Sequence, residues 1–160
     1  MHTGDVVELQ TNGTIKLIDR KKNLFKLSQG EYISPEKLEN IYNKSLFIAQ
    51  IFVTGDSTKN FVVAIIVLDH DCLKMWAAKQ GVTKEGADLI ESDELSEAIH
   101  KDLNDRAGKA KLNSLEKIKK FHITTHTFTV DNGLLTPSMK LVRHHAKKMF
   151  KNEVEKLYEE

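Results

Sequence analysis

The sequence predicts an α+β fold: an N-terminal β-hairpin followed by a small mixed sheet of about three strands packed with helices. Three observations support this class. An Asn-Gly dipeptide separates two short apolar segments near the start, segment 61–68 is almost wholly apolar, and several segments carry apolar residues at helical spacing. The composition agrees, because 40% hydrophobic and 29% charged residues are typical of a globular domain.

Turn and cap residues mark the ends of the elements predicted in the first half of the chain. Asn12 and Gly13 form a strong turn signal between apolar segments. Ser34 is a good helix N-cap and Pro35 suits the first helical position. Segment 61–68 is nearly all Val, Ile and Leu, as expected of a strand buried on both faces. The elements expected here are a hairpin over 6–17, a helix that begins at Pro35 and carries Leu38, Ile41 and Tyr42 on its apolar face, and strands at 48–53 and 61–68.

The second half is predicted to be mainly helical. A helix over 71–80 stops at Gly81, and another begins after Ser92 with Leu95 and Ile99 on one face. The last helix carries lysines in its first half and glutamates toward its end, a polarity that opposes the helix dipole. The other expected elements are a loop over 82–91, a short helical piece at 115–118, a strand at 121–128 and the last helix over 143–158.

The charge balance argues against several classes of partner. Lys plus Arg number 24 and Asp plus Glu 23, so a net charge of +1 gives no overall drive toward nucleic acid or an anionic membrane. The seven histidines show no zinc-ligand spacing, and no metal site is predicted. Any phosphate chemistry must therefore come from local basic clusters.

Three local features could carry chemistry. Asp5, in Thr3-Gly4-Asp5, could accept hydrogen bonds from neighbouring hydroxyls, as on a ribose. The run from Asp19 to Lys26 places four cations next to a glycine-containing loop, and Lys140 follows a polar turn. Taken one at a time, each feature is also explained as ordinary surface charge.

In their order along the chain, these features resemble the motifs of adenylate-forming enzymes, which include acyl-CoA synthetases, luciferases and peptide-synthetase adenylation domains. That superfamily carries T-G-D, then D-R-x-K with a following glycine loop and P-x-E, then a lysine near the C-terminus. Within it, D-R-K-K-N-L-F-K-L-S-Q-G-E-Y and D-N-G-L-L-T-P-S-M-K are similar to eukaryotic long-chain fatty acyl-CoA synthetases. The matching residues are Thr3-Gly4-Asp5, Asp19-Arg20-Lys21-Lys22, Gly30, Pro35-Glu36 and Lys140.

The resemblance implies a domain organisation. Residues 1–20 would be the end of an N-terminal domain that leads to a hinge, and residues 21–160 would form a C-terminal lid domain. In the family the lid rotates between two reaction steps and presents a different face for each. Because the chain opens within the T-G-D motif and carries no phosphate-binding loop, we expect part of a longer protein, inactive without its N-terminal AMP-binding domain.

The resemblance also implies roles for individual residues. The C-terminal lysine of the family reaches the carboxylate and the α-phosphate during adenylation, where it would stabilise developing charge. Two departures from the family are visible: Met139 stands where many members have glycine, and the Arg20-to-Gly30 interval is one residue longer than in luciferase. The expected site residues are catalytic Lys140, nucleotide-binding Asp5 and Arg20, the hinge residue Lys22, and Lys26, Gly30 and Glu31 in a loop that faces coenzyme A.

The implied reaction has two steps. ATP and a fatty acid give an acyl-adenylate and pyrophosphate, and the thiol of coenzyme A then displaces AMP to give the thioester. The expected partners are the N-terminal domain, which would bind most of the magnesium, together with fatty acid, ATP and coenzyme A, and no nucleic acid. The expected location is the cytoplasmic side, where segments outside this chain could attach the full protein to the endoplasmic reticulum or another organelle.

Two alternatives stay open at this point. A stand-alone binding or regulatory module could use the same basic loop to dock an acidic partner without chemistry. A medium-chain ligase or a luciferase-like oxidase would carry a similar lid, because only the acyl pocket of the absent domain separates these enzymes.

Overall fold

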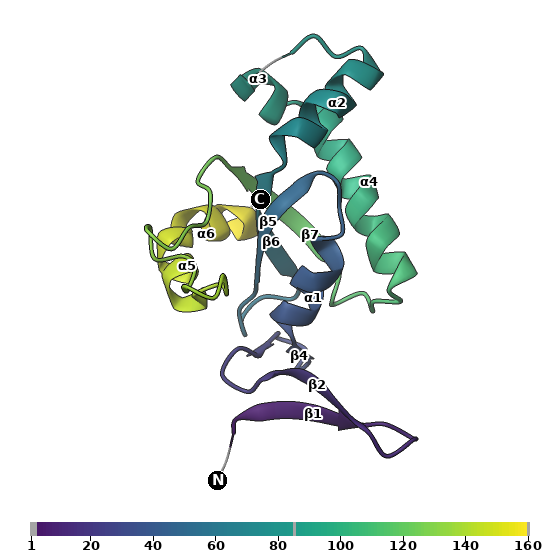
Figure 1. Ribbon diagram of the computed structural model, residues 1–160, viewed down its shortest axis with the longest axis vertical. Helices are drawn as coiled ribbons and strands as arrows, with labels where there is room; N and C mark the ends of the chain where they lie inside the picture. The colour runs from purple at the N-terminus through teal and green to yellow at the C-terminus, as the bar shows by residue number, and fades with distance from the viewer. Residues whose placement is uncertain (1–2, 85, 160) are drawn as a thin grey trace.

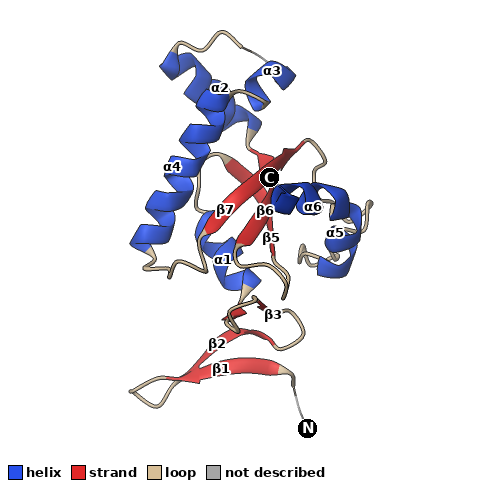
Figure 2. Ribbon diagram, turned by 180° about the vertical axis from the view of Figure 1, so that it is seen from behind, coloured by secondary structure: helices blue, strands red, loops and turns tan. Residues whose placement is uncertain are grey.

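The central sheet is built around one strand that is buried on both faces. The computed structural model describes residues 3–84 and 86–159. Strand β6 (Val62–Leu68) pairs antiparallel with β5 (Ile48–Thr54) and parallel with β7 (Ile118–Thr124), so the three-stranded sheet is mixed, as predicted (Figure 2). All seven residues of β6 are buried, which confirms the expectation from its aliphatic sequence.

Helices cover both faces of this sheet (Figure 1). One side carries α1 (Pro35–Tyr42), α2 (His70–Gln80) and α4 (Asp93–Lys109). The other side carries α5 (Arg143–Met149) and α6 (Lys151–Glu159). Within residues 3–84 and 86–159, no helix has both the length and the apolar character that crossing a membrane requires.

Alternate side chains of β6 enter two separate hydrophobic cores. Ala64 and Ile66 belong to the larger core with α1, α2 and α4. Ile65 and Val67 belong to the smaller core with α5 and the segment that precedes it. Successive side chains of a strand point to opposite faces, so one aliphatic strand serves both cores.

The N-terminal hairpin extends from one end of the molecule (Figure 1). Strand β1 (Asp5–Leu9) pairs antiparallel with β2 (Ile15–Arg20) around the Asn12-Gly13 turn, which confirms the predicted hairpin. A second small pair follows, in which β3 (Phe25–Lys26) lies antiparallel to β4 (Tyr32–Ile33). Several apolar side chains of the first hairpin are exposed, including Leu9 at 75%.

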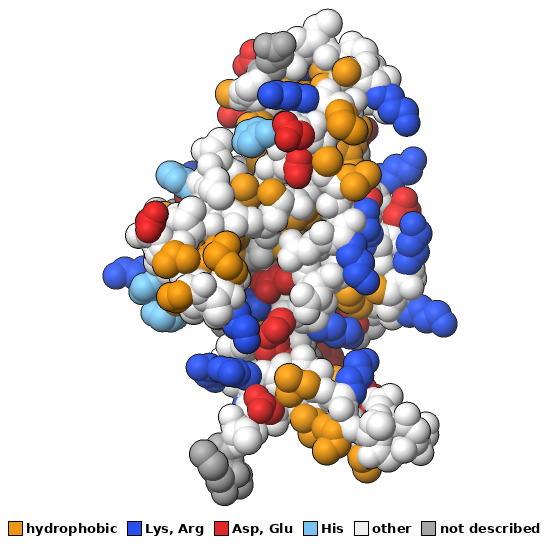
Figure 3. Space-filling view, in the orientation of Figure 1, with side chains coloured by type: hydrophobic (Ala, Val, Ile, Leu, Met, Phe, Trp, Pro, Cys, Tyr) orange, Lys and Arg blue, Asp and Glu red, His pale blue; other side chains and the backbone are white. Residues whose placement is uncertain are grey.

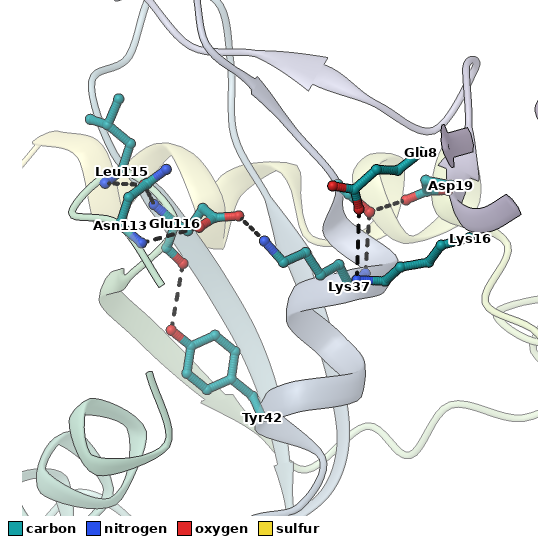
Figure 4. Close-up of polar contacts among 9 residues, drawn as sticks. Glu8, Lys16, Asp19, Lys37, Tyr42, Asn113, Leu115 and Glu116 are labelled. Carbon is teal, nitrogen blue, oxygen red and sulfur yellow. Dashed lines mark hydrogen bonds and ion pairs between the residues drawn. The ribbon is translucent and has the colours of Figure 1, made fainter. Parts of the chain in front are cut away.

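Helix α1 is docked at both ends. Ser34 caps its N-terminus by accepting a hydrogen bond from the Lys37 N–H, as its sequence predicted. The Lys37 ammonium pairs with Glu116, and the Tyr42 hydroxyl lies between the Glu116 carbonyl and the Ile118 N–H (Figure 4). Burial raises the pKa of Tyr42, so this hydroxyl stays protonated near neutral pH.

The prediction for residues 82–91 was wrong, because α3 (Gly86–Ile90) forms in the expected loop. Its Leu89 is buried in the larger core, so tertiary packing supports a helix too short to be stable alone. The helical piece expected at 115–118 was also wrong. The Asn113 side chain accepts hydrogen bonds from the N–H groups of Leu115 and Glu116, which makes a turn (Figure 4).

The strand expected at 121–128 lies earlier in the chain. Strand β7 runs from Ile118 to Thr124 because those residues pair with Val62–Val67 of β6. Phe128 pairs instead with the Gln50 side chain, which accepts from its N–H at 2.7 Å and donates to its carbonyl at 2.9 Å. A glutamine amide thus satisfies backbone groups that a strand would otherwise have to satisfy.

The last helix is two helices, with a break at Phe150. Phe150 is 2% exposed and packs against Phe128 with ring centroids 5.8 Å apart, so tertiary packing favours the break. The break also relieves part of the expected dipole conflict. Lys147 and Lys148 lie in the last turn of α5, and Glu153 lies in the first turn of α6, so these three charges favour their own helices.

Truncation of one isoleucine in the sheet and one in the hairpin should show how much each region contributes to stability. Ile65→Ala should lower the free energy of unfolding by about 2–5 kcal/mol, because Ile65 is fully buried between packed layers. The matched change Ile15→Ala should cost about 0.5 kcal/mol or less, because Ile15 is 67% exposed. Urea denaturation of each variant measures both values. Equal losses would contradict the assignment of the core to the sheet.

Candidate functional site

The hairpin brings the two predicted nucleotide-binding residues together. Asp5 and Arg20 are opposite one another in the β1–β2 register, and Arg20 Nε lies 3.9 Å from Asp5 Oδ1. The Lys21 N–H donates to the Gly4 carbonyl at 2.8 Å, which closes the end of the hairpin. The Arg20 side chain is 57% exposed and that of Asp5 is 34% exposed. This loose, exposed pair could exchange partners with a bound ligand.

A cleft of about 740 Å³ collects three of the predicted site residues. Arg20 comes from the end of β2, Lys22 from the turn after it, and Lys140 from the segment before α5. Basic and acidic side chains gather where the hairpin joins the rest of the molecule (Figure 3). Other lining residues include Asn23, Glu36, Glu39, Asn40, Asn43, Gln50, Ile51, Phe128, Thr136, Met139 and Arg143. The cleft therefore combines four cations with amide and carboxylate groups, a composition suited to a phosphate-bearing polar ligand.

The backbone of Lys140 is fixed while its side chain is exposed. The Thr136 N–H donates to the Lys140 carbonyl at 2.8 Å, and the Lys140 N–H donates to Thr136 Oγ1 at 3.1 Å. An isolated bridge between Leu135 and Leu141 closes the loop. Fixed backbone with an exposed ammonium is an arrangement that can aim a point charge at a ligand.

The Lys140 turn is anchored by a buried ion pair that the sequence did not predict. Arg143, the first residue of α5, donates from Nη1 to Glu39 Oε1 at 2.9 Å and from Nη2 to Glu39 Oε2. Glu39 Oε1 also accepts from the Val53 N–H at 2.9 Å. The side chains of Arg143 and Glu39 are only 15% and 10% exposed. The pair therefore joins α1, β5 and α5 three residues beyond Lys140.

The environment of Glu39 depends on that arginine. Burial raises the pKa of the Glu39 carboxyl, and the hydrogen bond and charge of Arg143 partly offset this rise. The sequence offered one signal for the pair: a cation at the start of a helix, where the dipole disfavours it. The partner of this cation is a carboxylate of the same chain.

The loop that contains Lys26, Gly30 and Glu31 does not line this cleft. The Leu27 N–H donates to the Glu31 carbonyl at 3.0 Å, and the Gly30 N–H donates to the Leu27 carbonyl at 2.9 Å. Gly30 has φ +91°, which side chains rarely adopt. The Lys26 ammonium lies 5.7 Å from the centre of the Tyr32 ring. The structure thus separates the cleft residues Arg20, Lys22 and Lys140 from the loop, while Asp5 pairs with Arg20 and does not itself line the cleft.

This loop is attached to the connection between β5 and β6. The Ser28 N–H donates to the Lys59 carbonyl at 2.9 Å, and Gln29 Nε2 donates to the Asn60 carbonyl at 3.1 Å. A Cβ atom on Gly55 would lie 2.4 Å from Phe25 Cε2, so only glycine admits the Phe25 ring there. The loop is therefore held by the sheet and not only by its neighbours in sequence.

No group of three or more His, Cys, Asp and Glu side chains is placed to hold a metal ion within residues 3–84 and 86–159. The adjacent His144 and His145 have ring centroids 4.2 Å apart, and His145 Nδ1 contacts the Gly133 carbonyl at 2.8 Å. These rings stabilise the segment before α5, and the described residues contain no donor set that fits a resident metal.

Comparisons with known proteins find a family model and relatives that match nearly the whole chain. The model for the family described as "AMP-binding enzyme C-terminal domain" matches residues 22–160. Over 158 residues the chain is 46% identical to the long-chain-fatty-acid–CoA ligase 6 of Homo sapiens, covering 99% of this chain and 23% of that protein. The chain therefore spans about a quarter of the length of such relatives.

Solved structures share the fold. The adenylation domain of a carboxylate reductase from Mycobacterium chelonae is 34% identical with a TM-score of 0.83, over 99% of this chain and 23% of that one. The corresponding domain from Segniliparus rugosus, in complex with AMP and a co-purified carboxylic acid, is 33% identical with a TM-score of 0.80, over 98% and 23%. Both superpositions cover the hairpin as well as the helical part of the chain.

Substitution of Arg143 should expose the cost of burying Glu39. Arg143→Met should lower the free energy of unfolding by about 3–5 kcal/mol at neutral pH, because it leaves a buried carboxylate without its cation. The double variant Glu39→Gln/Arg143→Met should lose less. In Arg143→Met the pKa of Glu39 should rise further above its ordinary value of 4.5, so stability relative to the native chain should recover as pH falls.

Denaturation at several pH values measures this effect. The recovery should be complete below about pH 4.5, where Glu39 is protonated in the unfolded chain too. A pH-independent loss, or an equally unstable double variant, would mean that the arginine acts by packing alone.

Replacement of Met139 by glycine should stabilise the chain. Met139 has φ +60°, which costs a residue with a side chain roughly 1–2 kcal/mol, and its side chain is 67% exposed. Met139→Gly should therefore raise the free energy of unfolding by about 0.5–1 kcal/mol after the greater unfolded-chain entropy of glycine is subtracted. Ser138→Gly, at a residue outside the left-handed region, is the matched control and should lower stability. Destabilisation by Met139→Gly would show that the Met139 side chain has a role of its own.

Proposed function

Because the chain belongs to the AMP-binding enzyme C-terminal domain family, we propose that it is the lid of a long-chain fatty acid–CoA ligase. Such an enzyme couples ATP and a fatty acid to give an acyl-adenylate and pyrophosphate, and then transfers the acyl group to coenzyme A. The observation that carries the proposal is the meeting of Arg20, Lys22 and Lys140 in one cleft, in a chain similar over 99% of its length to such a ligase.

In the first step Lys140 stabilises charge. A carboxylate oxygen attacks the α-phosphorus of ATP while the bond to pyrophosphate breaks, and negative charge gathers between the two groups. The exposed ammonium, held on the turn that Glu39 and Arg143 anchor, neutralises that charge. Asp5 accepts hydrogen bonds from the ribose hydroxyls, and Arg20 contacts the same nucleotide.

In the second step the loop of Lys26, Gly30 and Glu31 faces the substrate. The coenzyme A sulfur attacks the acyl carbonyl carbon, the bond to the phosphate oxygen breaks, and AMP leaves. The loop does not line the cleft, which supports the alternate use of two lid faces. Lys22 lies in the exposed turn between β2 and β3, where a hinge would change the orientation of the lid. Residues 1–20 would stay with the N-terminal domain, and residues 21–160 would rotate.

Magnesium accompanies ATP in this chemistry, and the described residues contain no cluster that fits it. Its ligands are therefore assigned to the ATP phosphates and the N-terminal domain. The long-chain assignment rests on the names of relatives, because the acyl pocket lies in that domain too. This chain alone would be inactive, because it supplies only those residues of each site that belong to the lid.

Removal of the Lys140 charge in the full-length ligase should separate the two steps. Lys140→Ala should slow acyl-adenylate formation, measured as pyrophosphate release, by about 10²–10³-fold. Thioester formation from supplied acyl-adenylate should change little, because a different face serves that step. Lys148→Ala, an exposed lysine of α5 outside the cleft, is the control and should leave both rates unchanged.

Equal losses in both steps would overturn the role of Lys140. A native protein that forms no adenylate with a series of fatty acids would overturn the proposed function itself. A preference for medium-length acids in that series would correct the substrate class while keeping the reaction.

A further inference from the structure

Asp19, the residue before Arg20, is buried where the hairpin meets the rest of the chain. It is 3% exposed, and it lies beside the first turn of α1 (Figure 4). Its Oδ1 accepts from the Arg20 N–H at 2.7 Å and from Asn23 Nδ2 at 3.1 Å. Its Oδ2 accepts from Ser34 Oγ at 2.7 Å and from the Glu36 N–H at 3.4 Å. Both oxygens of a buried carboxylate are thus satisfied, as burial of a charge requires.

Most of these contacts cross the turn that contains Lys22. Asp19 belongs to β2 of the hairpin, whereas Asn23, Ser34 and Glu36 follow Lys22 in the chain. Three of the four hydrogen bonds therefore join the two sides of the proposed hinge. A large rotation at Lys22 would move α1 away from β2 and break them.

The hydrogen bond between Ser34 and Asp19 lies at the N-terminus of α1. Ser34 donates to Asp19 while its oxygen accepts from the Lys37 N–H at 3.2 Å, so one hydroxyl joins the carboxylate to the N-cap of α1. The positive end of the helix dipole favours the negative charge of Asp19 at this position. The carboxylate thus completes the cap of α1 from the other side of the hinge.

We propose that Asp19 is a positioning residue that latches the lid in its adenylation orientation, an inference that rests on the proposed function. In the orientation of this structure Lys140 shares its cleft with Arg20, the residue of the hairpin side that is proposed to contact the nucleotide. The loop of Lys26 to Glu31 lies outside that cleft. The three hydrogen bonds of Asp19 that cross the hinge would be broken by the rotation, so they lower the free energy of this orientation relative to the rotated one.

The latch predicts that loss of Asp19 changes the rates of the two half-reactions of the full-length ligase differently. Asp19→Ala should slow acyl-adenylate formation, measured as pyrophosphate release in a single turnover, roughly tenfold, a typical size for conformational coupling. Thioester formation from supplied acyl-adenylate and coenzyme A should be unchanged or faster, because the lid leaves the latched orientation more readily. Asp19→Asn, which keeps the shape and loses the charge, should give a smaller split in the same direction.

Asp69→Ala is the matched control. Asp69 caps α2 by accepting from the Asp71 N–H at 3.1 Å and the Cys72 N–H at 2.9 Å, and it spans no hinge. Its loss should lower the melting temperature as a lost cap does and should leave the ratio of the two half-reaction rates unchanged. Ser34→Thr, which retains the hydroxyl, should keep the native ratio.

The outcomes separate the latch from the proposed function. A native ligase that forms acyl-adenylate, with Asp19 variants that slow both steps equally or neither step, would overturn the latch alone. If Asp19→Ala fails to fold, Asp19→Asn and Ser34→Ala decide the question by the same ratio. Failure of the native protein to form acyl-adenylate would instead overturn the function on which the latch rests.

Discussion

The ion pair between Glu39 and Arg143 holds the candidate site in one geometry. Glu39 lies on α1, accepts from the Val53 N–H of β5, and accepts hydrogen bonds from both terminal guanidinium nitrogens of Arg143 at the start of α5. A buried carboxylate without that cation carries a large desolvation cost, so the three elements are stable together and costly to separate. Because Lys140 lies three residues before Arg143, the position of the exposed lysine follows from a contact that is itself buried.

The central sheet serves both groups of predicted site residues. Residues of β5 line the cleft. The connection from β5 to β6 holds the loop of Lys26 to Glu31, because the carbonyls of Lys59 and Asn60 accept hydrogen bonds from it. The packing of β6 between two cores makes this support rigid. The proposed hinge would confine rotation to the turn after β2, where Lys22 is exposed and where the hydrogen bonds of Asp19 to Ser34 and Glu36 cross the turn.

The sequence by itself determined the elements whose signals are local. The Asn12-Gly13 turn, the Ser34-Pro35 helix start and the stop at Gly81 depend on the conformations of single residues, and all appear as predicted. The apolar run of β6 determined its burial on both faces. The ordered motifs determined the family and the site residues to test, since each motif is contiguous in the chain.

Only the tertiary structure decided how those residues meet. Glu39 and Arg143 are 104 positions apart, and the burial that makes their contact matter has no local signature. The break at Phe150 follows from packing into the smaller core, although the apolar spacing of the sequence alone favours a continuous helix. The short helix around Leu89 follows from packing into the larger core, although the sequence alone favours a loop. The physical reason is that caps and turns depend on neighbours in the chain, whereas desolvation depends on neighbours in space.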